Sequence, residues 1–440
     1  MPIPDEWLKY APKPKALGAN EKWNVFLSYR SVNRFWVLNL YDVLKELDYK
    51  VFLDQYELLD GDELIAKLQD GLAMSQAGVL IWSTAAADSK WVFKEFQTME
   101  TRATNDEKFR FVPVKLDGQQ LPVFAQNRVF EDFSSYPDGP NGGELLRLVY
   151  AITGQTMSAE AIRFANDQTT LTKDIITELN AAKIIGDAEG IIKLAKANTL
   201  PWRTNAAIGC TAAENLIKLK KNDEAIEILE CVVEQFPKSI RPKQLHALAL
   251  ARKAEQQENK EVKLEGFKQA QIIMAKLYVE GERDPETMGI FARTWMNRYE
   301  LSGDINELKK SRDLYVEGFE KAPYDYYTGI NAAAKSVLIG TEAELTKGAA
   351  FAKRVEEITG TKEVPGDYWR TATIAEVFLI QKNYPAAGDM FQKAVAMALE
   401  EKGSLESTYK QACRLMEKLQ PSAAEQGMIK AAFEHLLVKS

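Results

Sequence analysis

Histidine and cysteine are scarce in this chain of 440 residues, which has two His and three Cys, all of them after residue 200. Because no CxxC or HxxxH spacing occurs, the sequence argues against a structural zinc site. Catalysis in the first 200 residues would have to proceed without either residue type, which excludes Ser-His-Asp and Cys-His nucleophiles there. Cys210 and Cys231 fall in apolar helical patterns, and we expect packed thiols rather than a disulfide.

Long apolar runs and a surplus of basic residues are also absent. No run approaches the roughly 18 residues of a membrane-spanning helix, and the start of the chain lacks the pattern of a secretory signal. The net charge of −7 argues against a basic surface that binds nucleic acid. With 25 Gly and 16 Pro, the composition is neither fibrous nor disordered. We therefore expect a soluble cytoplasmic protein of two or three domains, with neither nucleic acid nor a membrane as partner.

Residues 22–154 alternate short apolar runs with amphipathic stretches, after a leader of residues 1–21 that looks loose. The runs are rich in Val, Ile and Phe, which is typical of strands buried on both faces. They cover residues 24–29, 50–54, 77–83 and 109–116. Between them, amphipathic helices are expected at 32–47, 62–74 and 90–102. This alternation predicts a parallel sheet with helices on both faces, and ligands bind such sheets at the carboxyl ends of the strands.

Residues 157–438 are predicted to form successive helices separated by short polar or Pro/Gly breaks. Two segments, which begin at Ala213 and Ala375, carry small or apolar residues at shared offsets of 3, 12, 16 and 19 positions. Such offsets are typical of the helix pair of a tetratricopeptide repeat (TPR), in which small residues allow close approach of antiparallel helices. Ala247 and Ala292 indicate a third and a degenerate fourth unit. An ordinary helical bundle is the alternative to this superhelical array.

Polar residues gather at the predicted carboxyl ends of the strands. The first strand ends in Ser28, Tyr29, Arg30 and Ser31, the second in Asp54, and the third in Trp82 and Ser83. In the next helix, Trp91 and Glu95 are four residues apart and therefore share a face. An aromatic ring and a carboxylate would then face the same loops. From spacing alone, the simpler interpretation is a core tryptophan and a glutamate that pairs with a nearby basic residue.

Three motifs occur in a fixed order: FLSYRS at the first strand, FLD with Gly61 seven residues later, and SKWVFKE after the third strand. Together they resemble the Toll/interleukin-1 receptor (TIR) domain over about residues 22–154, and its enzymatic branch most closely. Adaptor TIR domains usually lack the carboxylate of the third motif, whereas Glu95 is present here. The resemblance implies a flavodoxin-like α/β fold, with a five-stranded parallel sheet and helices on both faces.

The enzymatic branch cleaves the nicotinamide–ribose bond of NAD+, so the resemblance implies NAD+ as substrate, with no separate cofactor and no metal. Glu95 then takes the catalytic role and Trp91 walls the pocket beside it. A carboxylate suits this chemistry because it offsets the charge of an oxocarbenium-like ribose, while nicotinamide leaves as a neutral molecule without a general acid. Tyr29, Arg30 and Ser31 match positions near the nucleotide, although Ser31 stands where some relatives carry a second arginine.

Ser83 and Asp54 complete the predicted substrate-binding set. The loop Asp54–Glu63, with Leu59 and Gly61, corresponds to a segment that moves and mediates assembly in this family. We expect self-association through this loop. The isolated domain, residues 1–154, is expected to be soluble but poorly active, because a neighbour's loop would be missing.

The helical half has a resemblance of its own. The stretches at 284–295 and 318–333 resemble the repeat-type regulatory region of stress-activated mitogen-activated kinase kinase kinases and its bacterial counterparts, which controls the association of an attached catalytic domain. For Tyr324, Tyr326 and Tyr327, packing in a repeat seam and a ligand pocket are both open interpretations.

These resemblances predict an NAD+ glycohydrolase, or a cyclase, whose oligomerisation is controlled by the repeat domain. An unknown ligand or protein would act as the trigger on the repeats, and the role would be that of a prokaryotic anti-phage effector of innate immunity. One alternative is a non-catalytic TIR scaffold that assembles partners. Another is an enzyme that acts on host NAD+ in virulence.

Overall fold

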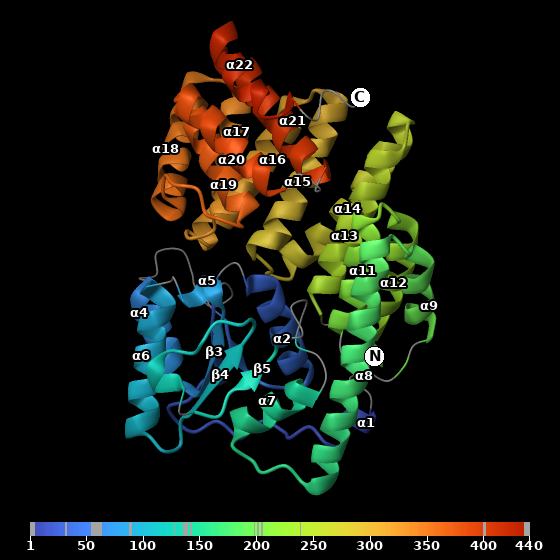
Figure 1. Ribbon diagram of the computed structural model, residues 1–440, viewed down its shortest axis with the longest axis vertical. Coiled ribbons are helices and arrows are strands. Elements are labelled where there is room, and N and C mark those ends of the chain that lie inside the picture. The colour runs from blue at the N-terminus through green and yellow to red at the C-terminus, as the bar shows by residue number, and fades with distance from the viewer. Residues whose placement is uncertain are drawn as a thin grey trace. The chain divides into compact units, whose positions relative to one another are not determined.

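The computed structural model describes residues 5–30, 33–53, 64–87, 90–126, 128–134, 140, 143–197, 199, 202–203, 206–237, 239–398 and 402–434. The chain divides into two compact units, Met1–Leu277 and Tyr278–Ser440. The first unit holds an α/β domain and the first helix pairs, and the second holds further helix pairs (Figure 1).

Five parallel strands form the sheet of the first unit, in the order β2-β1-β3-β4-β5. Their bounds are Trp23–Ser28 (β1), Val51–Phe52 (β2), Ser75–Trp82 (β3), Arg110–Lys115 (β4) and Glu131–Asp132 (β5). The expected five-stranded parallel sheet is thus confirmed. Strand β5 has only two residues, both acidic, so no apolar run marks it in the sequence.

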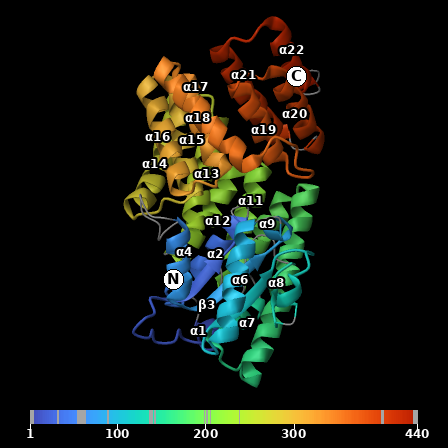
Figure 2. The same cartoon turned by 90° about the vertical axis from the view of Figure 1, so that its left-hand side faces the viewer.

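Two layers of helices cover the sheet. Helices α2 (Arg34–Glu46) and α7 (Gly143–Thr153) pack on one face, and α4 (Leu64–Ala73) and α6 (Lys90–Asn105) pack on the other. Figure 1 shows the strands between these layers, and Figure 2 views the domain from the α6 side. Along β1 the side chains alternate, because Leu27 joins the core under α2 and α7 and Phe26 joins the core under α4 and α6.

The segment before the sheet packs against the domain, although a loose leader was expected. Helix α1 (Asp5–Leu8) carries Trp7, which is only 2% exposed and belongs to the core under α2 and α7. The ring of Tyr10 stacks on Phe164 at 4.6 Å between centroids, and the Tyr49 hydroxyl donates to the carbonyl of Pro12 at 2.8 Å. Single aromatic residues between prolines produce no periodicity, so the sequence pattern did not reveal this packing.

Helix α8 (Ala159–Ile185) links the sheet domain to the helix pairs. Ala165 and Ile176 belong to the core of the sheet domain, whereas Leu179 belongs to the core of the next helices. Helices α7 and α8 are in close contact, since a Cβ on Gly143 would lie 1.8 Å from the carbonyl oxygen of Ala165. Glycine at residue 143 is therefore required by this contact. The α/β domain and α8 share one hydrophobic core.

Antiparallel helix pairs follow, as the small-residue offsets predict. The first unit continues with α9 (Ala188–Ala197), α11 (Ala206–Lys218), α12 (Asn222–Gln235), α13 (Arg241–Gln256) and α14 (Lys260–Val279). Ala213 and Ala225 are fully buried where α11 meets α12. The same pair approaches closely at Gly209, where a Cβ would lie 2.4 Å from a methyl group of Val232. The expected TPR-like helix pairs are confirmed.

A direct hydrogen bond joins the sheet domain to these pairs. The backbone amide of Ile240, at the start of α13, donates to the Asp42 carboxylate of α2 at 2.9 Å. Asp42 is 4% exposed, so this carboxylate is held inside the contact between the two helices. The Asp42 carboxylate accepts from a backbone amide that, at the start of a helix, has no partner within the helix.

The described part of the second unit holds three complete helix pairs of the same kind. These are α15 (Pro285–Ser302) with α16 (Ile305–Lys321), α17 (Tyr326–Ile339) with α18 (Glu342–Thr359), and α19 (Tyr368–Ile380) with α20 (Tyr384–Met397). Helices α21 (Lys402–Leu419) and α22 (Ala423–Ala431) follow. Ala375 and Ala387 are fully buried between α19 and α20, at the positions that the repeat offsets predict.

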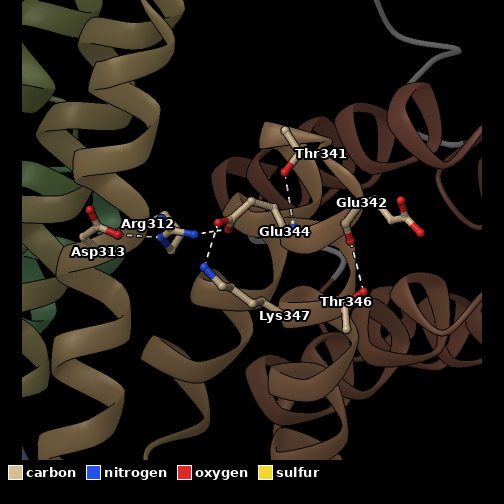
Figure 3. Close-up of polar contacts among 7 residues, drawn as sticks. All are labelled: Arg312, Asp313, Thr341, Glu342, Glu344, Thr346 and Lys347. Carbon is tan, nitrogen blue, oxygen red and sulfur yellow. Dashed lines mark hydrogen bonds and ion pairs between the residues drawn. The ribbon is translucent and has the colours of Figure 1, made fainter.

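An ion-pair cluster ties α16 to α18, the second helices of successive pairs. Figure 3 shows that Arg312 and Lys347 converge on the carboxylate of Glu344. The Lys347 Nζ to Glu344 Oε1 distance is 2.9 Å. Thr341 caps α18, since its hydroxyl accepts from the backbone amide of Glu344 at 3.3 Å. Arg312 and Glu344 are largely buried, so this cluster is less screened than a surface ion pair.

A buried polar network lies where α17, α19 and α21 meet. The Lys335 ammonium donates to the side-chain oxygen of Gln411 at 2.8 Å, and the Gln411 amide donates to Glu376 at 2.6 Å. Burial raises the pKa of Glu376 to about 7, with the nearby Lys335 charge opposing the shift. Burial likewise lowers the pKa of Lys335 to about 8, against the pull of Glu376. The network therefore holds two charges that the unfolded chain would solvate more favourably.

This network predicts a specific pH dependence of stability. The folded pKa of Glu376 lies above its ordinary value of 4.5, so its contribution is fully present below pH 4.5 and is lost as the pH rises towards 7. We expect the unfolding free energy of the wild type to fall by about 1–3 kcal/mol across that range, relative to Glu376→Gln. Chemical denaturation of both proteins at pH 5 and pH 7 measures this difference. Parallel pH profiles for the two proteins would contradict it.

Candidate active site

Glu95 lies at the carboxyl edge of the sheet, near the start of α6. The helix turns Val92, Phe96 and Met99 towards the core under α4 and α6. Glu95 is three residues after Val92 and four before Met99, so it follows the same apolar stripe and is half-buried. Burial of a carboxylate in an apolar stripe lowers the stability of the fold unless the carboxylate has polar partners. Its placement therefore points to a specific role at this edge.

Ser28, the last residue of β1, contacts this carboxylate directly. Its hydroxyl donates to Glu95 Oε2 at 2.5 Å. Ser28 is 1% exposed and follows the phase of Phe26, so its side chain points to the α6 side of the sheet. The structure thus joins the first and third motifs through one hydrogen bond. The sequence drew attention to Ser28 as part of the first motif but gave it no role of its own.

Ser83 joins two further elements at the same edge. It follows β3 and is 3% exposed. Its hydroxyl donates to the side-chain oxygen of Asn33 at 2.8 Å and accepts from the amide of Ala86 at 3.2 Å. Asn33 immediately precedes α2, and the sequence gave no signal for it. These bonds hold the end of β3 to the start of α2, while a contact between Ser83 and substrate stays a prediction.

The two residues after Ser28 differ in their surroundings. Tyr29 is 9% exposed and belongs to the core under α2 and α7, on the face of the sheet opposite Glu95. Arg30 is half-buried, and its carbonyl accepts from the amide of Asn33 at 2.8 Å. Their expected contacts with the nucleotide stay predictions.

Several predicted site residues lie outside the described residues. These are Ser31, Asp54 and the rest of the loop Asp54–Glu63 with Leu59 and Gly61. Trp91 belongs to α6 one turn before Glu95, but its side chain is also outside the described part of the chain. Their roles stay predictions.

Besides Glu95, the first unit holds a cavity and a second carboxyl group with a shifted pKa. A cavity of about 430 Å³ opens at the amino edge of the sheet, where Asn24, Gln76 and Arg110 lie near the starts of their strands. Burial raises the pKa of Glu131, on β5, to about 7, with Arg147 opposing the shift. Over the described ranges, no group of three His, Cys, Asp or Glu residues is arranged to hold a metal ion.

Of the tyrosines singled out in the helical half, Tyr326 is partly buried against the core of the second unit and Tyr327 is 40% exposed, so packing and a ligand pocket both stay open interpretations. Tyr315 is 3% exposed and meets Tyr327 edge to face at 6.1 Å between centroids. Gly289 allows this arrangement, because a Cβ there would lie 2.6 Å from the Tyr327 ring.

Cys210 is buried in the core of the first helix pairs, as expected, whereas Cys231 is exposed on α12. The helices of the described part lack the combination of length and apolarity needed to cross a membrane.

Comparison with known families matches two regions of the chain. The TIR domain family matches residues 25–146, and the Tetratricopeptide Repeats-Sensor family matches residues 221–336. The chain thus combines a TIR domain with tetratricopeptide sensor repeats, which confirms the TIR resemblance of the first motifs and the repeat pattern of the helical half. The resemblance of the helical half to kinase regulatory regions stays a prediction.

Among curated proteins, the chain is similar to the probable 2′ cyclic ADP-D-ribose synthase TcpB of Brucella melitensis and of Brucella abortus. Each is 33% identical over 78 residues, which is 18% of this chain and 31% of the relative. The chain therefore spans about a third of the length of these relatives.

Two solved structures are also similar. The TIR domain of the Toll-related receptor TRR-2 from Hydra magnipapillata is 18% identical and has a TM-score of 0.23, covering 26% of this chain and 86% of that one. A thermophilic TPR protein from Thermus thermophilus is 14% identical with a TM-score of 0.34, covering 49% and 100%.

Proposed function

We propose that this protein is a TIR-domain enzyme that cleaves the nicotinamide–ribose bond of NAD+. The observation that carries the proposal is the half-buried Glu95 carboxylate at the carboxyl edge of the sheet, bonded to Ser28 of the first motif. The similarity of the TIR domain to TcpB, described as a probable 2′ cyclic ADP-D-ribose synthase, supports the same chemistry.

The proposed reaction breaks the bond between ribose C1′ and the nicotinamide nitrogen. The electron pair of that bond goes to the pyridinium ring, so nicotinamide leaves neutral and positive charge develops on the ribose. Glu95 offsets this charge in a partly desolvated site, where electrostatic stabilisation is stronger than in water. Water, or a hydroxyl of the same ADP-ribose, then attacks C1′ and releases one proton. The absence of His and Cys from this domain is therefore compatible with the reaction.

Incubation of the purified full-length protein with NAD+ tests the proposal. We expect release of nicotinamide in equal amount to ADP-ribose, to a cyclic isomer, or to their sum, resolved by chromatography. The ratio of linear to cyclic product distinguishes a glycohydrolase from a cyclase. A folded, assembled protein that leaves NAD+ intact would support the alternative, a scaffold that assembles partners through TIR and repeat contacts.

The repeat domain is proposed to control activity through assembly, in an anti-phage immune effector. An enzyme that destroys a central metabolite must be silent until triggered, and a site completed by a neighbour is inactive while protomers are apart. The sensor repeats between residues 221 and 336 would receive the trigger.

Activity per molecule should therefore rise with protein concentration. Over a hundredfold range, we expect NAD+ turnover per protomer of the full-length chain to increase in step with the oligomer fraction seen by light scattering. Constant specific activity, without a change in oligomeric state, would exclude control by assembly.

Leu59 provides a second test of assembly. Leu59→Asp should reduce turnover and self-association together, because a charge in an apolar contact must be desolvated when protomers meet. Size-exclusion chromatography with light scattering, beside the NAD+ assay, measures both properties. If turnover fell while the oligomer distribution stayed the same, the loop would act only within its own site.

A further inference from the structure

We infer that Ser28 is a positioning residue for the Glu95 carboxylate. The inference rests on the proposed function and adds a residue to which the motifs assign no role. Its basis is the hydrogen bond of 2.5 Å from the Ser28 hydroxyl to Glu95 Oε2, which crosses from β1 to α6.

Ser28 and Ser75 are both buried strand serines in this sheet, but their hydroxyls bond to different kinds of partner. Ser75, at the other end of the sheet, is 0% exposed and donates to the backbone carbonyl of Gly71 at 2.7 Å. The acceptor of that bond is a backbone carbonyl. Ser28 is equally buried but directs its one donor to a carboxylate side chain. The Ser28 bond therefore orients the Glu95 side chain and does not satisfy a backbone group.

A hydroxyl suits this task better than a basic group would. Hydrogen bonds from hydroxyl to carboxylate are short, about 2.5–2.7 Å, and stronger than bonds between neutral groups. The hydroxyl itself carries no charge, so it fixes the carboxylate without cancelling the negative charge that an oxocarbenium-like ribose requires.

The backbone makes this positioning rigid. Ser28 pairs with Leu80 of β3, so its Cα is fixed by the central strands of the sheet. Glu95 is fixed by α6, whose Val92 and Phe96 are both 1% exposed in the core beneath. The hydrogen bond then joins two elements that cannot easily shift, and the carboxylate keeps one orientation before substrate binds. At a site preorganised in this way, a small displacement of the catalytic group lowers activity strongly.

Ser28→Ala and Ser75→Ala form a matched pair for the test, in the full-length protein. Both remove one hydroxyl from a buried strand position, so both should lower the thermal midpoint slightly. We expect Ser28→Ala to lower kcat for nicotinamide release about tenfold to a hundredfold, with KM changed less than about twofold. Ser75→Ala should keep the wild-type kcat.

Further variants separate positioning from folding and from the proposed reaction. Ser28→Thr keeps the donor and should recover most of the lost kcat. Equal kcat values for Ser28→Ala and Ser75→Ala, in a wild type that cleaves NAD+, would overturn the positioning role alone. A wild type without NAD+ cleavage would overturn the proposed function as well.

Discussion

Replacement of Glu95 by glutamine is expected to abolish NAD+ cleavage while leaving the fold intact. Glutamine keeps the shape and an oxygen that accepts from Ser28, but it removes the negative charge that offsets the developing charge on ribose. Loss of one such electrostatic contribution typically lowers kcat by about 10²–10³, and loss of the full charge should exceed this. Nicotinamide release under saturating NAD+, measured with thermal unfolding of the same samples, gives both results.

Glu100→Gln is the matched control for this variant. Glu100 lies on the same helix and forms an ion pair with Arg128 at 2.8 Å, away from the carboxyl edge of the sheet. Its loss should leave turnover unchanged and cost at most about 1 kcal/mol of stability. Near wild-type turnover in Glu95→Gln would show that this carboxylate is not the catalytic group.

The fold was predictable wherever the chain repeats a simple physical pattern. Strands β1, β3 and β4 are buried on both faces and therefore read as apolar runs, and the helix pairs repeat small residues at fixed offsets. Elements without such a pattern were missed. Strand β5 is two acidic residues at the edge of the sheet, and it pairs with β4 through its backbone and through an ion pair of Asp132 with Lys115 at 3.8 Å.

Only the site residues that belong to the three ordered motifs could be predicted from the sequence. Glu95 was assigned a role because the three motifs in order resemble the TIR domain, whereas its spacing from Trp91 alone favoured a structural glutamate. The roles of Ser28 and Asn33 depend instead on contacts over 67 and 50 residues of sequence, to Glu95 and Ser83. No local spacing encodes such contacts. For Tyr29 the motif predicted a position near the nucleotide, but the alternation of side chains along the strand places it in the core on the other face of the sheet.

The contact between the sheet domain and α8 changes what is expected of the isolated TIR segment. Residues 1–154 were expected to form a soluble domain. The structure instead places Ala165 and Ile176 of α8 in the same core as β1, β3, α2 and α7. The amide of Gly143 donates to the Thr169 hydroxyl of α8 at 2.9 Å. Truncation at residue 154 removes all of these partners and exposes the α7 surface that they cover.

A fragment of residues 1–154 should therefore be strongly destabilised, whereas a fragment of residues 1–281 should fold. Each large apolar side chain that loses its burial costs about 1.5–3 kcal/mol, and the shorter fragment loses the packing of Phe164 on Tyr10 as well as that of Ile176. A total of several kcal/mol approaches the whole stability of a typical domain, about 5–15 kcal/mol. The longer fragment keeps the first compact unit and ends after α14, at Gly281, whose φ of 97° marks a turn.

Circular dichroism, urea denaturation and size-exclusion chromatography of the two fragments give the comparison. We expect a cooperative transition and a defined particle for residues 1–281, and aggregation or a transition without cooperativity for residues 1–154. The variant Ile176→Ala in the longer fragment is the intermediate case and should cost about 2–5 kcal/mol, since it leaves a cavity in a core position that is 4% exposed. If the short fragment unfolded with the same midpoint as the long one, α8 would be a neighbour of the TIR domain rather than a part of its core.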